Sequence, residues 1–140
     1  NGVYINSKWS YNVTGLYQIP VVEMNFGFSI LGREGYPIPY VHSVGTSEGT
    51  KNILLQGIGE ERHDDPFLLD LRLSKEFRLG GVGLTVGIDA FNVTNEQTIL
   101  QRDLLINQTS RGTTRKAARA DRMFEQQSPR VFRLGARLTF

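Results

Sequence analysis

Five segments of this chain alternate apolar and polar residues with the period of two that a β-strand imposes on its side chains. In one of them Leu69, Leu71 and Leu73 alternate with Asp70 and Arg72. The chain has no cysteine, which excludes a disulfide scaffold and a thiolate metal site, and it has no apolar run long enough for a membrane helix. The alternation predicts an all-β domain of antiparallel strands over about 9–19, 22–32, 67–79, 82–92 and 130–140.

The connections between these segments are of two kinds. Pro20-Val21 and Gly80-Gly81 are two-residue links of the length found in β-hairpins. The other two connections are loops of about 33–66 and 93–129, which is long for a compact domain. Short turns at one end and long loops at the other are typical of an outer-membrane barrel, with periplasmic turns and extracellular loops.

The Gly80-Gly81 turn predicts the register of one hairpin. A two-residue loop pairs Leu79 with Val82, and it then places Arg72 opposite Asp89 on the polar face. On the other face apolar residues meet apolar residues, except where Lys75 interrupts the pattern. We interpret Arg72 and Asp89 as a lumen-facing cross-strand pair that stabilises the sheet by up to about 1 kcal/mol. A contact with a transported substrate is the less favoured alternative.

The Pro20-Val21 link predicts the register of the first hairpin in the same way. It sets Tyr17 opposite Met24 and Gly15 opposite Phe26, so that a small residue lies under an aromatic one. Here too the apolar residues of both strands share one face. Turn length and face pattern are independent features, and they agree in both hairpins.

A lipid-facing sheet fits these segments better than a soluble one. Their apolar stretches have the length of a tilted transmembrane strand, and Lys75, the one charge on the apolar face, is near a turn where it can snorkel. Five strands cannot close a barrel, so we expect further strands before Asn1 and a chain that is a C-terminal fragment. A soluble antiparallel β module that binds a partner is the alternative. Aromatic residues near the strand ends are Trp9, Tyr11, Tyr17, Phe132 and Phe140.

Other motifs indicate no catalytic, cofactor or metal site. The charged run 60–65, EERHDD, lacks the spacing of a metal site and reads as a solvated loop. The segment 110–124 contains five basic residues and could form a basic helix that meets nucleic acid. We favour an extracellular loop, either solvated or touching anionic lipopolysaccharide, and expect no nucleic-acid partner and no enzyme activity.

The sequence resembles the C-terminal end of TonB-dependent outer-membrane receptors, and most closely the Oar-like members that have an N-terminal carboxypeptidase-regulatory-like domain. The resemblance covers most of the chain outside the long loops, and the order of its motifs is more specific than any one of them. The stretches that carry it are WSYNVTGLYQIP at 9–20, LGREGYPIPY at 31–40, LLDLRLSKEFRL at 68–79, GIDAFNVTNEQT at 87–98 and SPRVFRLGARLTF at 128–140.

This resemblance implies a bacterial outer-membrane protein whose 22-stranded barrel surrounds a plug, the five segments here being its last five strands. It implies uptake of an unknown bulky substrate, driven by a TonB complex that contacts the absent plug. A passive porin is the alternative among barrels. The resemblance also implies that the last strand is an assembly signal for the barrel assembly machinery, formed by Phe132, Leu134, Ala136, Leu138 and Phe140.

Overall fold

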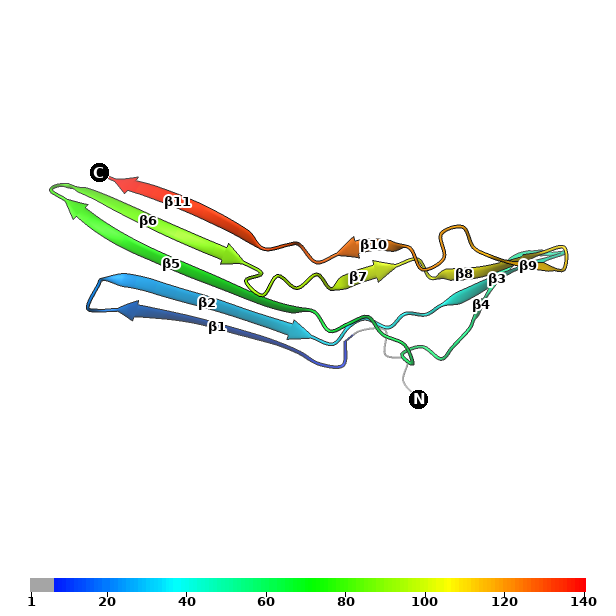
Figure 1. Ribbon diagram of the computed structural model, residues 1–140. Helices are drawn as coiled ribbons and strands as arrows, with labels where there is room; N and C mark the ends of the chain where they lie inside the picture. The colour runs from blue at the N-terminus through cyan, green and yellow to red at the C-terminus, as the bar shows by residue number, and fades with distance from the viewer. Residues whose placement is uncertain (1–6) are drawn as a thin grey trace. The chain divides into compact units, whose positions relative to one another are not determined.

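A computed structural model describes residues 7–140, and these residues form β-strands joined by turns and loops, with no helix (Figure 1). The predicted all-β class is therefore confirmed. The strands are β1 Ser10–Ile19, β2 Met24–Arg33, β3 Val41–Thr46, β4 Gly49–Leu54, β5 Phe67–Leu79, β6 Val82–Phe91, β7 Ile99–Arg102, β8 Leu105–Ser110, β9 Thr113–Lys116, β10 Met123–Gln126 and β11 Val131–Thr139.

The strands divide between two compact units. One unit, here called the sheet unit, comprises residues 10–33, 67–97 and 128–140. The other, here called the insert unit, comprises the described residues 7–9, 34–66 and 98–127. Within the described residues 7–140 no helix is long and apolar enough to span a membrane.

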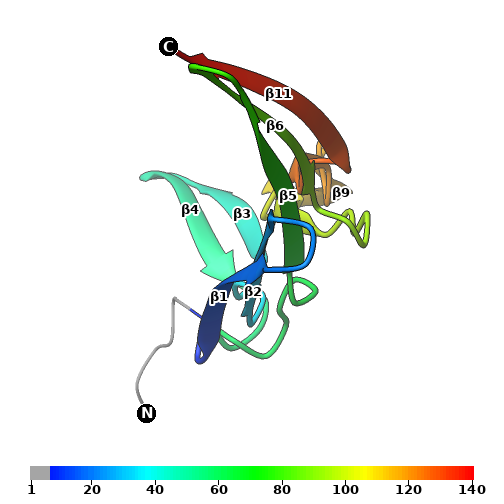
Figure 2. The same cartoon turned by 90° about the vertical axis from the view of Figure 1, so that its left-hand side faces the viewer.

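The sheet unit is a single five-stranded antiparallel sheet in the order β1-β2-β5-β6-β11. In Figure 2 the ribbons of β5, β6 and β11 follow one another as a curved layer. The pairing of Gly32 with Phe67 and of Phe91 with Val131 shows that both long connections leave the same end of this sheet. The two short turns lie at its opposite end.

The β5–β6 hairpin has the register predicted from Gly80-Gly81. Leu79 pairs with Val82, and Arg72 pairs with Asp89. Gly80 has a φ of 64°, which is the left-handed conformation that a two-residue hairpin loop requires.

The register predicted for the first hairpin is wrong by two residues. Tyr17 pairs with Phe26, not with Met24, and the turn has four residues, 20–23. A two-residue hairpin loop needs a positive φ at its first position, which Pro20 cannot adopt. The longer turn instead places the positive φ, 50°, on Glu23. Because the shift is an even number of residues, every side chain keeps its predicted face.

The registers of all four strand pairs collect the apolar residues on one face of the sheet. One row across this face runs Val13, Ile30, Leu69, and the next runs Phe28, Leu71, Ala90, Phe132. The face continues to the edge strand β11, where Phe132 is 66% exposed and Leu134 is 77% exposed. Among the described residues of the sheet unit, the buried ones are Gly27, Gly32 and Asn92. None of them has a large apolar side chain, so this sheet has no apolar core of its own.

Two glycines on the apolar face lie under aromatic rings. A Cβ on Gly15 would come within 2.4 Å of the Phe28 ring, and a Cβ on Gly32 would come within 2.5 Å of the Tyr11 ring. The predicted partner of Gly15 was Phe26, and the two-residue shift replaces it with Phe28. In both places the ring covers backbone that has no side chain of its own. This cover compensates for the weakening that a glycine causes within a strand.

The insert unit shows that the predicted loops 33–66 and 93–129 contain strands. β4-β3-β8-β9 form a four-stranded sheet, and β10-β7 form a two-stranded one. β3 and β8 run parallel, so the two connections are hydrogen-bonded to each other. The basic helix considered for 110–124 is wrong, because Arg111 and Gly112 have positive φ and turn the chain back into β9.

Candidate functional site

The insert unit encloses a polar hollow of about 260 Å³. Its walls come from segments that are far apart in the sequence: the approach to β3, the charged run 60–65, β7, and the turn before β10. Charged or hydrogen-bonding side chains dominate the lining. Those that matter here are Tyr40, Glu61, Arg62, His63, Arg102 and Asp121.

Asp121 joins two walls of the hollow. Its Oδ1 accepts a hydrogen bond of 3.0 Å from the Tyr40 hydroxyl, and its Oδ2 accepts one of 3.1 Å from Arg102 Nη1. Burial raises the pKa of Tyr40, and the hydrogen bond to Asp121 raises it further, so the phenol stays protonated as a donor. The carboxylate is thus engaged by a cation and a hydroxyl, which is a structural arrangement and not that of a free general base.

His63 lies in the same hollow with a lowered pKa. Burial of the imidazole is the main cause, and the positive charge of Arg102 adds to it. The ring is therefore neutral at neutral pH. Within residues 7–140 no group of three histidine or acidic side chains is arranged to hold a metal ion. The charged run 60–65 is among the residues searched and forms no such group.

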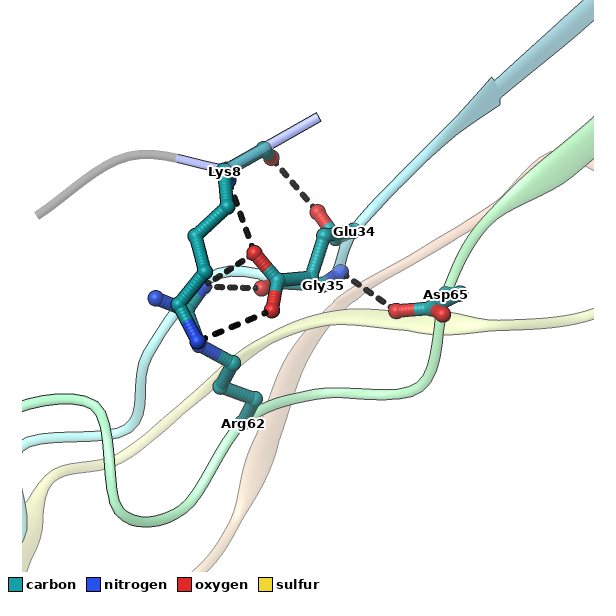
Figure 3. Close-up of polar contacts among 6 residues, drawn as sticks. Lys8, Glu34, Gly35, Arg62 and Asp65 are labelled. Atoms are coloured by element: carbon teal, nitrogen blue, oxygen red, sulfur yellow. Dashed lines mark hydrogen bonds and ion pairs between the residues drawn. The ribbon is translucent and has the colours of Figure 1, made fainter. Parts of the chain in front are cut away.

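Glu34 holds the two ends of the segment 34–65 together, and its side chain is only 14% exposed (Figure 3). Arg62 Nη1 approaches Glu34 Oε2 at 3.2 Å and also donates to the Gly35 carbonyl at 2.9 Å. The backbone N–H of Lys8 donates to the same carboxylate at 2.7 Å. The N–H of Gly35 donates to Asp65 Oδ1 at 2.8 Å. These contacts tie the two ends of the segment 34–65 together.

On the polar face of the sheet unit, Asp89 binds two arginines. Arg72 Nε lies 3.5 Å from Asp89 Oδ1, so the predicted cross-strand partners are indeed near each other. Arg133 makes the closer contact, donating from Nε at 2.9 Å and from Nη2 at 2.7 Å to Oδ2. Sequence reasoning missed this second arginine, although the alternation of β11 places it on the same face. The Arg133 guanidinium also lies 5.3 Å from the centre of the Phe91 ring.

We expect the two arginines to contribute unequally. Arg133→Gln should lower the free energy of unfolding by about 1 kcal/mol, and Arg72→Gln by less than half of that, since both guanidiniums are largely exposed and their contacts are screened by salt. Both losses should nearly vanish in an Asp89→Asn background. A double-mutant cycle from urea titrations measures these terms. Equal single losses, or losses that persist without Asp89, would contradict the arrangement.

Asn92 is the most buried described side chain, at 2% exposure, and follows β6 with a φ of 48°. Its Nδ2 donates to the carbonyls of Glu96 at 2.8 Å and Ser128 at 2.7 Å, and its Oδ1 accepts from the Glu96 N–H at 3.2 Å. The backbone N–H of Asn92 donates to Asp70 Oδ1 at 2.9 Å. One side chain therefore connects the end of β6 to the start of the segment that leads into β11.

Four of the five residues of the predicted assembly signal lie on β11, at the edge of the sheet, and Phe140 directly follows this strand. The four on β11 alternate onto the apolar face and pair with residues of β6. All of them are exposed among the described residues, and the signal itself stays a prediction. They are Phe132, Leu134, Ala136, Leu138 and Phe140.

The polar clusters of both units pair carboxylates with guanidiniums and with other hydrogen-bond donors. Comparison of the chain with protein-family models, curated proteins and solved structures finds no match. The sheet unit separates its side chains onto two faces, one apolar and one polar.

Proposed function

We propose that the chain forms part of the wall of a bacterial outer-membrane barrel, in a receptor for energy-coupled, TonB-dependent uptake of a bulky substrate. The wall is supported by the two-faced sheet, and the receptor class is supported by the sequence resemblance. In this proposal the protein is not an enzyme. Its partners are outer-membrane lipid and lipopolysaccharide, the barrel assembly machinery and, through a plug outside these residues, a TonB complex.

The single observation that carries the proposal is an apolar face that spans five strands and is covered by no other layer of the sheet unit. Large side chains on it, such as Leu134 and Phe132, remain mostly exposed. Covering each of them would stabilise the protein by about 2 kcal/mol. Exposed apolar patches of this extent mark a surface that meets lipid or another protein, and hydrocarbon covers a smoothly curved wall without needing a complementary shape.

Strand length agrees with this environment. β1, β2 and β6 have ten residues each. At ~3.3 Å per residue and a tilt of ~40°, such strands rise roughly 23 Å, close to the ~25 Å apolar band of outer-membrane barrels. The 13 residues of β5 extend somewhat further.

The edges of the sheet imply that the wall continues. Within the described residues β1 and β11 each pair on one side only. Unpaired backbone groups are not tolerated in hydrocarbon, so in this proposal both edges pair with other strands of the barrel. The polar face, with Asp89, Arg72 and Arg133, then lines a water-filled lumen, and the long connections are extracellular.

Cysteine labelling tests this proposal cleanly, because the chain has no native cysteine. In the full-length protein in outer membranes, on a cysteine-free background, Arg72→Cys and Arg133→Cys should react with a membrane-impermeant maleimide. Leu71→Cys and Leu134→Cys, their neighbours on the other face, should react at least tenfold more slowly and recover reactivity on unfolding in urea.

A soluble β module predicts the opposite outcome. The chain would then be a folded monomer without detergent, and a cysteine at position 134 would label readily. A passive porin shares the labelling pattern of a receptor, so the two are separated by uptake. If uptake is unchanged when the TonB complex is removed, the barrel proposal still holds, but the assignment to the receptor class is wrong.

A further inference from the structure

We infer that Lys75 binds a lipid phosphate and marks the level at which the apolar face meets the headgroups near the short turns. This inference rests on the proposed wall function and adds a specific partner to it. Lys75 is the one charged residue on the apolar face of the sheet, where its cross-strand neighbours are Met24 and Val86. Among the residues that the structure describes, none forms an ion pair with it.

The side chain of Lys75 points toward the short-turn end of the sheet. Its Nζ lies 5.2 Å from the centre of the Phe77 ring, which is the next residue on the same face in the direction of Gly80. This is the orientation of a lysine that places its alkyl chain along apolar surface and its ammonium at an interface. Girdles of aromatic residues flank the apolar band of outer-membrane barrels at this level.

The position of Lys75 along β5 agrees with that interface. Phe67 begins the strand at the other end, eight residue steps away. At ~3.3 Å per step and a tilt of ~40°, Lys75 lies roughly 20 Å from the level of Phe67, within an apolar band of ~25 Å. The remaining ~5 Å is about the reach of an extended lysine side chain, so the ammonium arrives at the headgroups.

A lipid phosphate is the partner that this geometry favours. The ammonium approaches the interface from the hydrocarbon side, where the phosphate is the anionic group of a phospholipid. In phosphatidylglycerol, unlike phosphatidylcholine, no headgroup cation neutralises this phosphate, so an anionic phospholipid is the favoured partner. A protein carboxylate is the usual alternative, and the carboxylates of β5 and β6 lie on the opposite face, at Asp70, Glu76 and Asp89. Attraction to an anionic lipid surface amounts to about 1 kcal/mol per lysine, or roughly fivefold in lipid preference.

The test compares Lys75→Gln with Arg78→Gln in the full-length protein, reconstituted in phosphatidylcholine vesicles with and without phosphatidylglycerol. Arg78 is a matched control because it lies on β5, near the same turn, on the opposite face. We expect phosphatidylglycerol to raise the thermal midpoint of the wild type and of Arg78→Gln. Lys75→Gln should lose a clearly measurable part of that rise, and added salt should reduce the rise in the other two.

Spin labels at positions 71 and 75 distinguish a failure of the phosphate site from a failure of the wall proposal. If label 71 is accessible to oxygen and label 75 lies at the headgroups, a normal phosphatidylglycerol response of Lys75→Gln overturns the phosphate site and leaves the wall intact. If label 75 lies as deep as label 71, the headgroup position is wrong. If label 71 is more accessible to a water-soluble relaxing agent than to oxygen, the wall proposal itself is wrong.

Discussion

Replacing Asn92 with alanine should lower the free energy of unfolding by about 3 kcal/mol, because the side chain is buried and bonds two carbonyls and one N–H. Removing it leaves the Glu96 and Ser128 carbonyls without their donor in a site closed to water. We expect hydrogen exchange in the segment 93–98 to accelerate together with the loss. Urea titration of the full-length protein gives the magnitude, and exchange gives the location.

Asn92→Gly separates the two roles of this residue. Glycine adopts the φ of 48° without strain, whereas alanine adds about 1 kcal/mol for the left-handed conformation. Glycine should therefore cost about 1 kcal/mol less than alanine and still lose the side-chain hydrogen bonds. Asn12→Ala, at an exposed position of β1, is the control and should change stability by less than about 0.5 kcal/mol. A loss at position 92 as small as that of the control would refute the assigned role.

Replacing Gly35 with alanine should lower the free energy of unfolding about as much as Asn92→Ala, because the added methyl group would crowd the backbone. Its Cβ would lie 1.8 Å from the carbonyl oxygen of His63 and 2.8 Å from that of Asp64, and backbone atoms cannot yield as a flexible side chain does. We expect a loss of about 2–3 kcal/mol. Hydrogen exchange in 61–65 should accelerate, since that segment must move away and release the Gly35–Asp65 hydrogen bond.

Gly81→Ala is the matched control for this substitution. A Cβ at Gly81 would meet no heavy atom within 4 Å, and its φ lies outside the left-handed region. It should therefore change the free energy of unfolding by less than about 0.5 kcal/mol. Equal effects at positions 35 and 81 would show that the close approach between Gly35 and the run 60–65 does not form.

Local signals in the sequence account for the parts of the fold that were predicted. The Gly-Gly turn predicts the register of β5 and β6 because both turn types that favour it, I′ and II′, close a two-residue loop. The first hairpin shows the limit of that reasoning, since a proline in the loop excludes the two-residue turn and leaves several longer ones open. The positive φ at Glu23, which closes the actual turn, has no marker in the sequence.

The candidate sites were less predictable than the sheet. Alternation places Arg133 on the same face as Asp89, but only the order of the strands brings β11 beside β6. Asn92 had a weak signal, since an asparagine directly after a strand is suited to a positive φ. Nothing local indicates that it would reach Ser128, 36 residues away, or that Tyr40 would reach Asp121, 81 residues away.

The sequence by itself determined the five strands of the sheet unit and which face each of their side chains occupies. That information is local, because the period of a strand is two and even a two-residue slip of register leaves every face unchanged. The tertiary structure alone decided the parallel pairing of β3 with β8, the contact of Asn92 with Ser128 and the contact of Asp121 with Tyr40. Those depend on closing long stretches of chain, and whether such a closure forms is set by all the contacts it makes possible together, not by any short pattern of residues.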